Sequence, residues 1–469
     1  MEMTYDVKVW GIRKYRGTTK TSYNMRWMVA GMIRSKTFLT KALADAFRAE
    51  LMTAVHRGEA FRADTGLPHT WKKQEDLSWY AFVCRYLDDH WQGTSANHRK
   101  DRARILTDAT EALWTKTQAP PDRDLLRRAL QGWAYSTAYR DAPCPEDVKA
   151  AIGWAEHNTV SVRKLSDPGL TRKVLVRISQ RKDGTPSAPR SAVKARNVLS
   201  HALDYAVECG YLDTNPLSQV KWRTPKVGVQ EVDLTAVPNP RQVRGFIDAI
   251  AEQRPSGPRL KAFFSTLYLT ALRPEEAVNV RWPDVHLPPW PWVVDAHEWR
   301  DPDPDGDWGE IVVREVAPEV GKQWTDSGEH RDRRQPKGRA VGASRVVPCP
   351  PKLTRILRRH QKEFGEGPGG LVFFGVRGHQ LDVGVYSRAW KRARRQVLTE
   401  EQRAGSFART PYDLRRACVS MWLDQGIVPA QVARWAGHSQ EVLLRVYAKC
   451  ISGSEERDKR RMTAGFTDF

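Results

Sequence analysis

The spacing of hydrophobic residues changes twice along the chain, which excludes a fold built from one kind of secondary structure. Apolar and polar residues alternate as in strands up to about residue 65, apolar residues recur at helical spacing through 70–220, and both patterns mix from about 238. A chain of 469 residues is also too long for one hydrophobic core. We predict a multidomain α+β protein with domains at 1–65, 70–220 and 238–469 and a linker at 221–237.

The first 65 residues contain three strand-like runs, at 5–9, 23–29 and 32–38. Turn-like residues separate them at Arg16-Gly17 and Ala30-Gly31. The pattern predicts a small sheet of three strands.

A helix is predicted after the third strand, because Thr40 can cap it and Leu43, Phe47 and Leu51 recur on one face. We expect this stripe to pack on the sheet. The same region is basic, and a sheet with basic residues on one face can read a DNA groove. The basic residues are Lys8, Arg13, Lys14, Arg16, Lys20, Arg26, Arg34 and Lys36. The alternative is a solvated edge, where lysines prevent strands from aggregating.

The second part of the chain is predicted to be almost entirely helical. Apolar residues share a face within 79–87 and again within 198–207, where Gly210 ends the helix. Between them, the basic stretch 172–184 has no clear period, and we interpret it as a loop between helices. Prolines and basic residues at 218–240 are typical of an interdomain linker.

The charge of the chain favours a polyanionic partner. The formal net charge is +21 with a pI near 9.8, and basic tracts such as 331–334 and 391–395 are distributed along the sequence. Each phosphate neutralised by Lys or Arg releases condensed counterions, so nucleic acid is the leading candidate. Lys194 and Arg196 are further candidate DNA contacts. The alternative is a soluble protein with a well-solvated basic surface.

The six cysteines are scattered without a CxxC pair, and no secretory segment or run of 18 apolar residues occurs. We expect a reduced, cytoplasmic protein that does not use a membrane. The acidic run 301–307 begins like a calcium loop, but Val312 stands where that loop needs Glu, and its prolines do not fit. Zinc-ligand spacing is also absent from the sequence, so we expect no metal.

Two short motifs lie far apart in the last 200 residues. Their chemically active residues are Arg273, Glu276, Tyr412, Arg415, His438 and Tyr447. His438 follows Arg415 by 23 residues, and Tyr447 follows His438 by nine. In this order and spacing, the motifs resemble the two boxes of the tyrosine recombinases, also called phage-type integrases. An isolated Arg-x-x-Glu would be weak, since it is usually a surface ion pair, but the whole set is specific.

The resemblance implies that Tyr447 attacks a DNA phosphodiester to form a 3′-phosphotyrosyl link and release a 5′-hydroxyl. Negative charge then builds on the non-bridging oxygens, and two guanidinium groups can neutralise it in fixed geometry. Arg273 and Arg415 are assigned that role, and His438 can donate a further hydrogen bond. The covalent intermediate keeps the phosphodiester energy, so no cofactor is expected.

The family also supplies a general acid from a lysine in a β-hairpin between the two boxes. The best match is Lys337, which precedes a returning strand ending in Val346-Val-Pro348. Arg339 and Lys322 are the alternatives, and an ordinary solvated hairpin lysine is the remaining interpretation of Lys337.

Glu276 stands three residues after Arg273, so we expect it on the same helical face, orienting active-site groups. Tyr412 departs from the family, which commonly has histidine there. A phenol can hold a phosphate by a hydrogen bond, but its ordinary pKa near 10 makes it a poor base near neutrality. The identity of any general base is therefore open.

Other aromatic residues near the carboxyl end are explained more simply by packing. Trp422 and Trp435 fall on helical faces, where tryptophan is usually part of a core. Tyr386 and Tyr412 are rival nucleophiles by residue type, but neither follows a Gly-His pair at the family's interval.

The resemblance covers about 190–450 well and 70–190 loosely, while residues 1–65 resemble the arm-site domain of actinobacterial phage and plasmid integrases. It implies a helical core-binding domain, a catalytic domain and an arm-binding domain. We therefore expect a mobile-element integrase that forms a homotetramer on two DNA duplexes, with a directionality factor and a host DNA-bending protein as partners. The alternatives are a type IB topoisomerase-like enzyme and a non-catalytic DNA-binding regulator.

Overall fold

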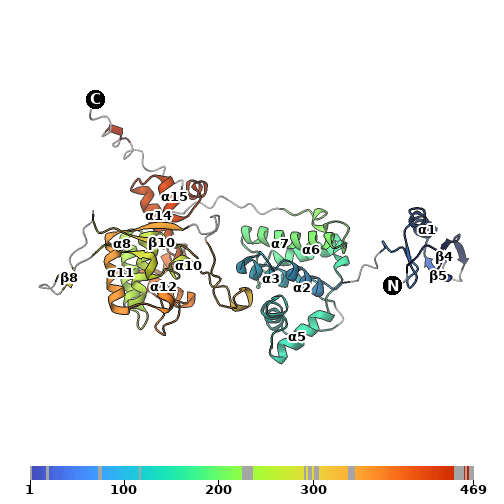
Figure 1. The fold of residues 1–469 in the computed structure, drawn as a ribbon, viewed down its shortest axis with the longest axis horizontal. Coiled ribbons are helices and arrows are strands. Elements are labelled where there is room, and N and C mark those ends of the chain that lie inside the picture. Colours follow the sequence, from blue (N-terminus) through green and yellow to red (C-terminus); the bar gives the residue numbers. More distant parts are fainter. Residues whose placement is uncertain are drawn as a thin grey trace.

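The computed structural model describes residues 3–16, 21–71, 77–115, 118–223, 236–289, 292–293, 298–299, 306–335, 344–447, 459 and 462–463. It shows a multidomain α+β fold: a small sheet with one helix, a helical domain, and a mostly helical domain around a small sheet (Figure 1). Three separate clusters of buried apolar residues correspond to these parts.

The amino-terminal sheet is built around β4 (Thr21–Val29). One edge of β4 pairs with β2 (Val7–Val9) and β3 (Arg13–Arg16), and the other edge pairs with β5 (Met32–Phe38). The sheet therefore has four strands, one more than predicted, because the polar run that forms β3 was read as part of a turn. A separate pair joins β1 (Met3–Thr4) to β6 (Phe61–Arg62).

Helix α1 (Lys41–His56) begins where the sequence predicts, with the Thr40 side chain accepting a hydrogen bond from the Leu43 amide at 3.3 Å. The predicted stripe was wrong at Leu43, whose side chain is 56% exposed. The prediction is confirmed at Leu51, which is buried, and at Phe47, which is partly buried against the same cluster, and two alanines of α1 are buried beside them. The contact face is therefore rotated from the predicted one.

The helical domain confirms the predicted all-helical segment. Its elements are α2 (Trp79–Asp89), α3 (Ala96–Thr110), α4 (Arg123–Ala129), η1 (Leu130–Ala134), α5 (Glu146–His157), η2 (Val162–Ser166), α6 (Pro168–Ile178), α7 (Pro189–Glu208) and η3 (Pro216–Ser218). The predicted faces within 79–87 and 198–207 point into one apolar cluster. The predicted linker lies largely outside the described residues.

Helix α6 occupies much of the stretch that we interpreted as a loop, so that interpretation was wrong. Asp167 caps the helix by accepting a hydrogen bond from the Gly169 amide at 2.9 Å, and Pro168 takes the first helical position. Val174 and Leu175 are buried in the domain core. Basic residues on the outer face hid this narrow apolar stripe in the sequence.

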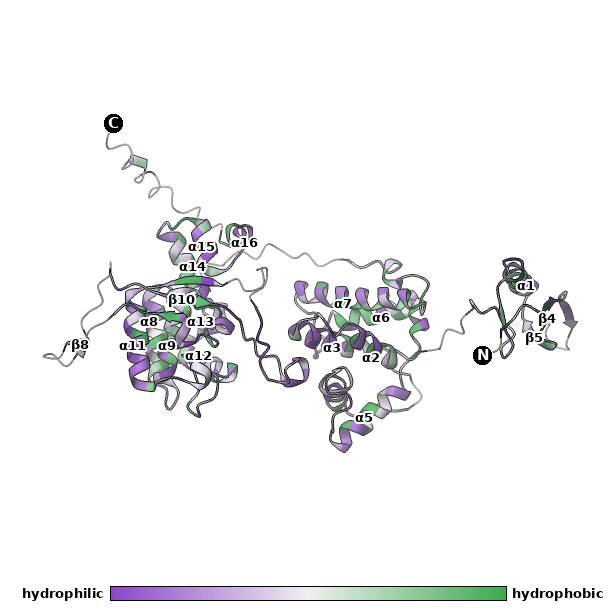
Figure 2. Cartoon of the chain, in the orientation of Figure 1, coloured by the Kyte–Doolittle hydropathy of each residue, from purple (hydrophilic) through white to green (hydrophobic). Residues whose placement is uncertain are grey.

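The carboxyl-terminal domain packs helices around the antiparallel sheet β11-β10-β7. Its elements are α8 (Pro240–Ala251), α9 (Gly257–Thr270), α10 (Pro274–Ala277), η5 (Trp282–Asp284), β7 (Val285–His286), β8 (Trp292–Val293), β9 (Glu298–Trp299), β10 (Gly309–Val313), η6 (Lys322–Trp324), β11 (Arg345–Cys349), α11 (Pro351–Phe364), η7 (Pro368–Gly370), α12 (Val383–Val397), α13 (Glu400–Ala404), α14 (Tyr412–Asp424), α15 (Pro429–Ala436) and α16 (Gln440–Val446). Hydrophobic residues of α9 and β10 lie inside this domain, and the outer side of α11 is hydrophilic (Figure 2).

Residues 314–335, here called the insert, form the described part of the connection between β10 and β11. The insert leaves the carboxyl-terminal domain and reaches the helical domain (Figure 1). Its residues Val320 and Trp324 belong to the apolar cluster of the helical domain. The domain that begins near residue 238 therefore contributes to the core of the domain before it.

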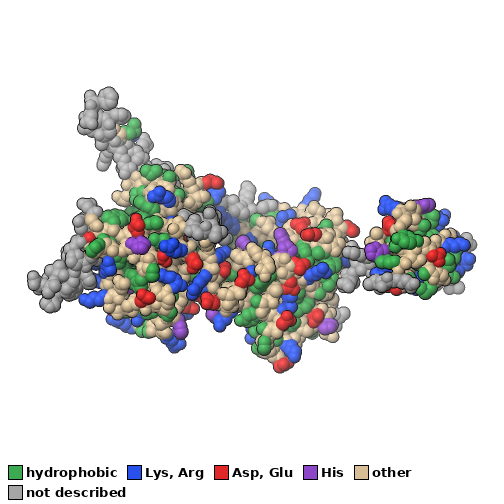
Figure 3. Space-filling model, viewed as in Figure 1, with side chains coloured by type: hydrophobic (Ala, Val, Ile, Leu, Met, Phe, Trp, Pro, Cys, Tyr) green, Lys and Arg blue, Asp and Glu red, His purple; other side chains and the backbone are tan. Residues whose placement is uncertain are grey.

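Basic side chains do not gather in one patch on the face of the molecule shown in Figure 3. On the face shown in Figure 3, Lys and Arg are mixed with Asp and Glu on every part of the described chain.

Within the residues that the structure describes, no helix is long and apolar enough to cross a membrane.

Candidate active site

Turns at helix ends bring the two sequence motifs together. Ala271 takes a left-handed conformation with φ 53° at the end of α9, and Arg273 follows as the N-cap of α10. Gly437, with φ 67°, ends α15 and places His438 just beyond it. Arg415 lies one turn into α14, and Tyr447 ends α16. Five separate elements thus converge on one site.

Glu276 is the centre of the site and is 1% exposed. Its carboxylate accepts a hydrogen bond from Arg273 Nη1 at 2.7 Å and another from the Arg273 backbone amide at 2.8 Å. Glu276 therefore contacts Arg273 directly, but the shared helical face predicted for the two residues was wrong. Arg273 precedes α10 as its N-cap and shares no helical face with Glu276.

Arg345 is a third arginine of this site that the sequence analysis missed. It opens β11, is 3% exposed, and pairs with both carboxylate oxygens of Glu276 at 2.8 and 3.2 Å. The alternation of residues along the strand could have revealed it, because Arg345 shares the inward face of β11 with Val347 and Cys349. An arginine at an inward strand position needs a buried partner.

Arg273, Arg345, Arg415 and Glu276 are here called the Glu276 cluster. The three arginines determine the ionisation of the Glu276 carboxyl. Burial alone would raise the pKa of Glu276, but the charges of Arg345, Arg273 and Arg415 outweigh it and lower the pKa to about 2. Glu276 is therefore ionised, and three guanidinium charges against one carboxylate leave an excess of two positive charges in the cluster.

Arg345 also holds the chain segment that carries His438. Its Nη1 donates to the Ala436 carbonyl at 3.2 Å. A side chain at Gly437 would overlap the Arg345 guanidinium, and the positive φ there also favours glycine. The close approach of Gly437 and Arg345 thus fixes where α15 ends.

Arg415 is fully buried behind His438. Its Nη1 donates to the Ala271 carbonyl, and its Nη2 donates to the Ala436 carbonyl at 2.6 Å and to His438 Nε2 at 2.7 Å. The direct contact with phosphate predicted for Arg415 therefore stays a prediction, because in this DNA-free structure carbonyl groups and an imidazole cover the guanidinium.

His438 is neutral and has a defined tautomer. Burial, followed by the charges of Arg415 and Arg273, lowers the pKa of His438 to about 3. A guanidinium can only donate, so His438 Nε2 accepts and the proton is on Nδ1. Nδ1 is buried and has no hydrogen-bond partner among the described residues. A buried donor without an acceptor is costly, and a bound anion would satisfy it.

Tyr447 lies beside this donor. Its ring centroid is 6.2 Å from that of His438, and the residue is 3% exposed. The Arg415 guanidinium lies 5.9 Å from the ring centroid of Tyr412. Tyr386 is buried in α12, and that burial raises its pKa to about 12.

The predicted packing residues lie in the core. Trp422 is buried, and its ring meets that of Trp435 edge to face at 5.5 Å. Lys337 and Arg339 lie outside the described residues, as does most of the acidic run 301–307. Lys322 lies on η6, and Trp324 of the same short helix packs into the helical domain.

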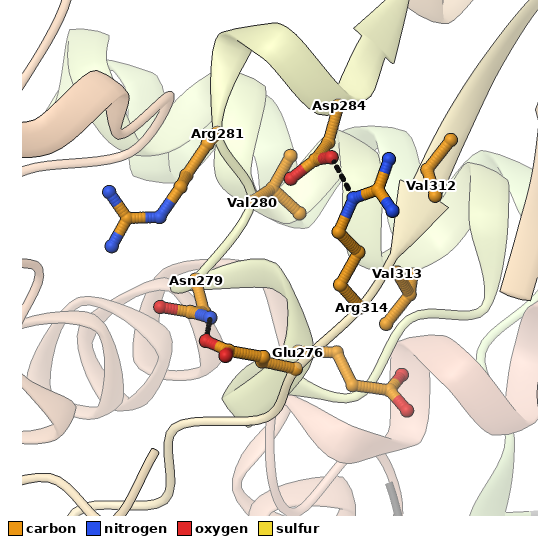
Figure 4. Close-up of a pocket in the computed structure, with 9 residues that line it drawn as sticks. Glu276, Asn279, Val280, Arg281, Asp284, Val312, Val313 and Arg314 are labelled. Carbon is orange, nitrogen blue, oxygen red and sulfur yellow. Dashed lines mark hydrogen bonds and ion pairs between the residues drawn. The ribbon is translucent and has the colours of Figure 1, made fainter. Parts of the chain in front are cut away.

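A pocket beside α10 includes Glu276 in its wall (Figure 4). Its most polar part is the ion pair of Arg314 with Asp284 at 2.6 Å. Asn279 donates to Glu315 at 3.5 Å, at the opposite side of the view. Because Asp284 and Arg314 neutralise each other, we assign the pocket no reactive role.

The candidate DNA contacts of the amino-terminal sheet lie on both of its faces. The strand register places Lys14, Arg34 and Lys36 on the side of Met25 and Trp27, which faces α1. It places Lys8, Arg13 and Arg26 on the opposite side. A single basic face was therefore a wrong prediction.

Three of these side chains have structural contacts, and one of them is Arg26, whose guanidinium lies 5.7 Å from the Trp10 ring centroid. Arg34 donates to the carbonyls of Ala63 and Asp64 at 3.0 and 2.8 Å. Lys36 Nζ lies 4.7 Å from the Phe47 ring centroid. On α7, Lys194 pairs with Asp101 and Arg196 lies over Trp222, so these contacts also have structural explanations.

No family model matches the chain, and no curated protein matches it, but solved structures do. A fragment of the Tn1549 transposon integrase in complex with transposon right end DNA is 16% identical, covers 82% of this chain and 100% of its own, and gives a TM-score of 0.48. A lambda integrase dimer bound to a COC′ core site is 16% identical over 91% of each chain, with a TM-score of 0.45. The XerH site-specific recombinase bound to difH is 12% identical and covers 80% of this chain and 93% of its own, with a TM-score of 0.42. The solved structures that the chain is similar to therefore include two integrases and a site-specific recombinase.

Proposed function

We propose that this chain is a site-specific tyrosine recombinase that cuts and rejoins DNA through a covalent bond between Tyr447 and a 3′-phosphate. The observation that carries the proposal is the Glu276 cluster beside Tyr447. Its excess of two positive charges lies next to the buried Nδ1–H of His438, which has no hydrogen-bond partner within the part of the chain that the structure describes. These are requirements for binding a phosphodiester and stabilising it as charge builds.

The reaction follows from the chemistry of the residues. The Tyr447 oxygen loses its hydroxyl proton and forms a bond to phosphorus as the bond to the 5′-oxygen breaks, and the leaving 5′-oxygen gains a proton, so the step is balanced. Arg273 is 24% exposed, so it is the arginine of the cluster best placed to contact the phosphate at once. The neutral His438 donates from Nδ1. Attack by a 5′-hydroxyl on the phosphotyrosyl bond reverses the step and reseals a strand.

The finer parts of the proposal concern biological context. We propose an integrase of a mobile element that assembles as a homotetramer on two duplexes, with Lys337 as the general acid. Lys8, Arg13 and Arg26 are the best placed amino-terminal residues for contacts with DNA, because they share the face of the sheet away from α1. A type IB topoisomerase-like enzyme would use the same chemistry on a single duplex.

A duplex nicked beside the cleavage position tests the chemistry. Loss of the short downstream strand prevents resealing, so the wild-type chain should accumulate a covalent protein–DNA complex. Tyr447→Phe should form none, whereas the matched variant Tyr386→Phe should retain it. A covalent complex with Tyr447→Phe would refute the proposed nucleophile. Relaxation of supercoiled DNA without any joining of two duplexes would favour the topoisomerase-like alternative.

A further inference from the structure

The tip of the insert is embedded in the helical domain. Trp324 and Val320 are only 2% and 3% exposed and lie in that domain's apolar cluster. The Val320 carbonyl accepts a hydrogen bond from Lys100 Nζ at 2.9 Å, and the Gln323 carbonyl accepts one from Ser136 Oγ at 2.7 Å. The tip is thus held by both apolar burial and hydrogen bonds to its backbone.

Arg99 depends on the insert for most of its partners. This arginine of α3 is 4% exposed and stacks on the Trp91 ring at 4.1 Å. Its guanidinium donates to both carboxylate oxygens of Asp326 at 2.7 and 3.0 Å and to the Trp324 carbonyl at 2.9 Å. A buried guanidinium without these acceptors would be strongly unfavourable, so the helical domain is matched to a docked tip.

The base of the insert reaches the active site. The Ala317 amide donates to the carbonyl of Glu275, the residue before Glu276, at 3.0 Å. Arg331 donates to the Ala317 carbonyl at 2.7 Å and to the Leu381 carbonyl at 2.6 Å. The two sides of the insert are joined by a bridge between Val316 and Arg334. A hydrogen-bonded path therefore runs from Glu275 toward the tip.

We propose that the insert is an intramolecular strut that ties the helical domain to the Glu276 cluster, so that DNA cleavage depends on the docked Trp324–Asp326 tip. This inference rests on the proposed function. The strut connects the helical domain to the residues around α10. Displacing its tip would therefore change the support of α10 without changing any residue that touches phosphate.

Variants at the tip separate this role from general stability. Asp326→Ala removes a side chain that is 70% exposed but pairs with Arg99. Trp324→Ala removes the buried ring, and Trp324→Phe retains an apolar ring. Glu329→Ala is the matched control, because Glu329 is an exposed acid of the same insert that pairs only loosely with Arg333, at 3.9 Å.

Solution scattering by the full chain tests docking independently of activity. Asp326→Ala and Trp324→Ala should increase the radius of gyration, while Glu329→Ala and Trp324→Phe should match the wild type. An unchanged radius in Trp324→Ala would contradict the strut. Wild-type inactivity on DNA would refute the proposed function, and the scattering comparison would still decide whether the tip is docked.

Single-turnover cleavage at saturating nicked duplex tests the coupling. Asp326→Ala and Trp324→Ala should cleave about tenfold more slowly, with Trp324→Phe close to the wild type and Glu329→Ala unaffected. Equal cleavage rates in Trp324→Ala and the wild type would overturn the proposal, even if the scattering shows that the tip has left the helical domain.

Discussion

Among the described residues, one network of buried arginines in the helical domain and another in the carboxyl-terminal domain balance their charges differently. In the helical domain, Asp108 and Glu111 both accept hydrogen bonds from Arg127 and Arg177, at 2.5 to 3.2 Å. In the carboxyl-terminal domain, Glu276 alone faces three arginines. The two inner arginines of the first network are matched one for one by carboxylates, and its two further partners, Arg104 and Arg123, are half-exposed to solvent, as expected for a structural role. The second keeps an excess of positive charge, which suits the binding of an anion.

Loss of Arg273 should have the largest effect on activity, because it is the most exposed arginine of the Glu276 cluster. We expect Arg273→Ala to lower single-turnover DNA cleavage by about a hundredfold to a thousandfold. Arg244→Ala removes an arginine that is 80% exposed on α8 and serves as the control. A comparable loss in both variants would mean that general positive charge, and not the cluster, supports cleavage.

Loss of Arg345 should affect both stability and cleavage. In Arg345→Met, Glu276 loses its bidentate partner, and the free energy of unfolding should fall by about 3 kcal/mol in urea titrations. Cleavage by the folded fraction should also fall, with partial recovery in Arg345→Lys. Unchanged cleavage by the folded fraction would show that Arg345 supports the fold alone.

Loss of Arg127 should affect stability alone. Arg127→Met leaves Asp108 and Glu111 with Arg177 as their remaining inner partner, so the free energy of unfolding should again fall by about 3 kcal/mol. The folded fraction should cleave DNA at the wild-type rate. A cleavage defect matching that of Arg345→Met would erase the distinction between the two networks.

The comparison also shows what the sequence can and cannot predict. Arg273, Arg415 and His438 were identified because their order and spacing are specific, and the structure brings them together. Arg345 was missed because its pairing with Glu276 spans 69 residues, and no local pattern records a contact between a strand and a distant helix.

Helix α6 was missed for a related reason. Its buried residues form a narrow stripe among basic ones, and the pair Asp167-Pro168 was the local signal for its start. The docking of Trp324 on the helical domain could not be predicted either. A tryptophan in a polar loop reveals that it needs burial but not which domain provides it.

The smallest predicted effect is on the pH dependence of stability. The pKa of His438 is lowered from 6.5 to about 3 on folding, so the unfolded chain binds more protons between these values. The contribution of His438 to the free energy of unfolding is therefore fully present above pH 6.5, and it decreases as the pH is lowered. Between pH 6.0 and 5.0, unfolding of His438→Gln should take up as much as about one proton fewer than unfolding of the wild type, so its free energy of unfolding should fall less steeply with acid. An identical slope in the wild type and the variant would contradict a neutral His438.

Mapping the DNA-linked peptide is the most direct test of the central claim. The covalent complex formed on nicked duplex would be digested with protease and nuclease, and the modified residue identified by mass spectrometry. We predict a nucleotide linked through its 3′-phosphate to Tyr447 and to no other residue. The assignment would be contradicted by a nucleotide linked to Tyr412 or Tyr386. It would also be contradicted if the wild-type chain formed no covalent complex on its own recombination site.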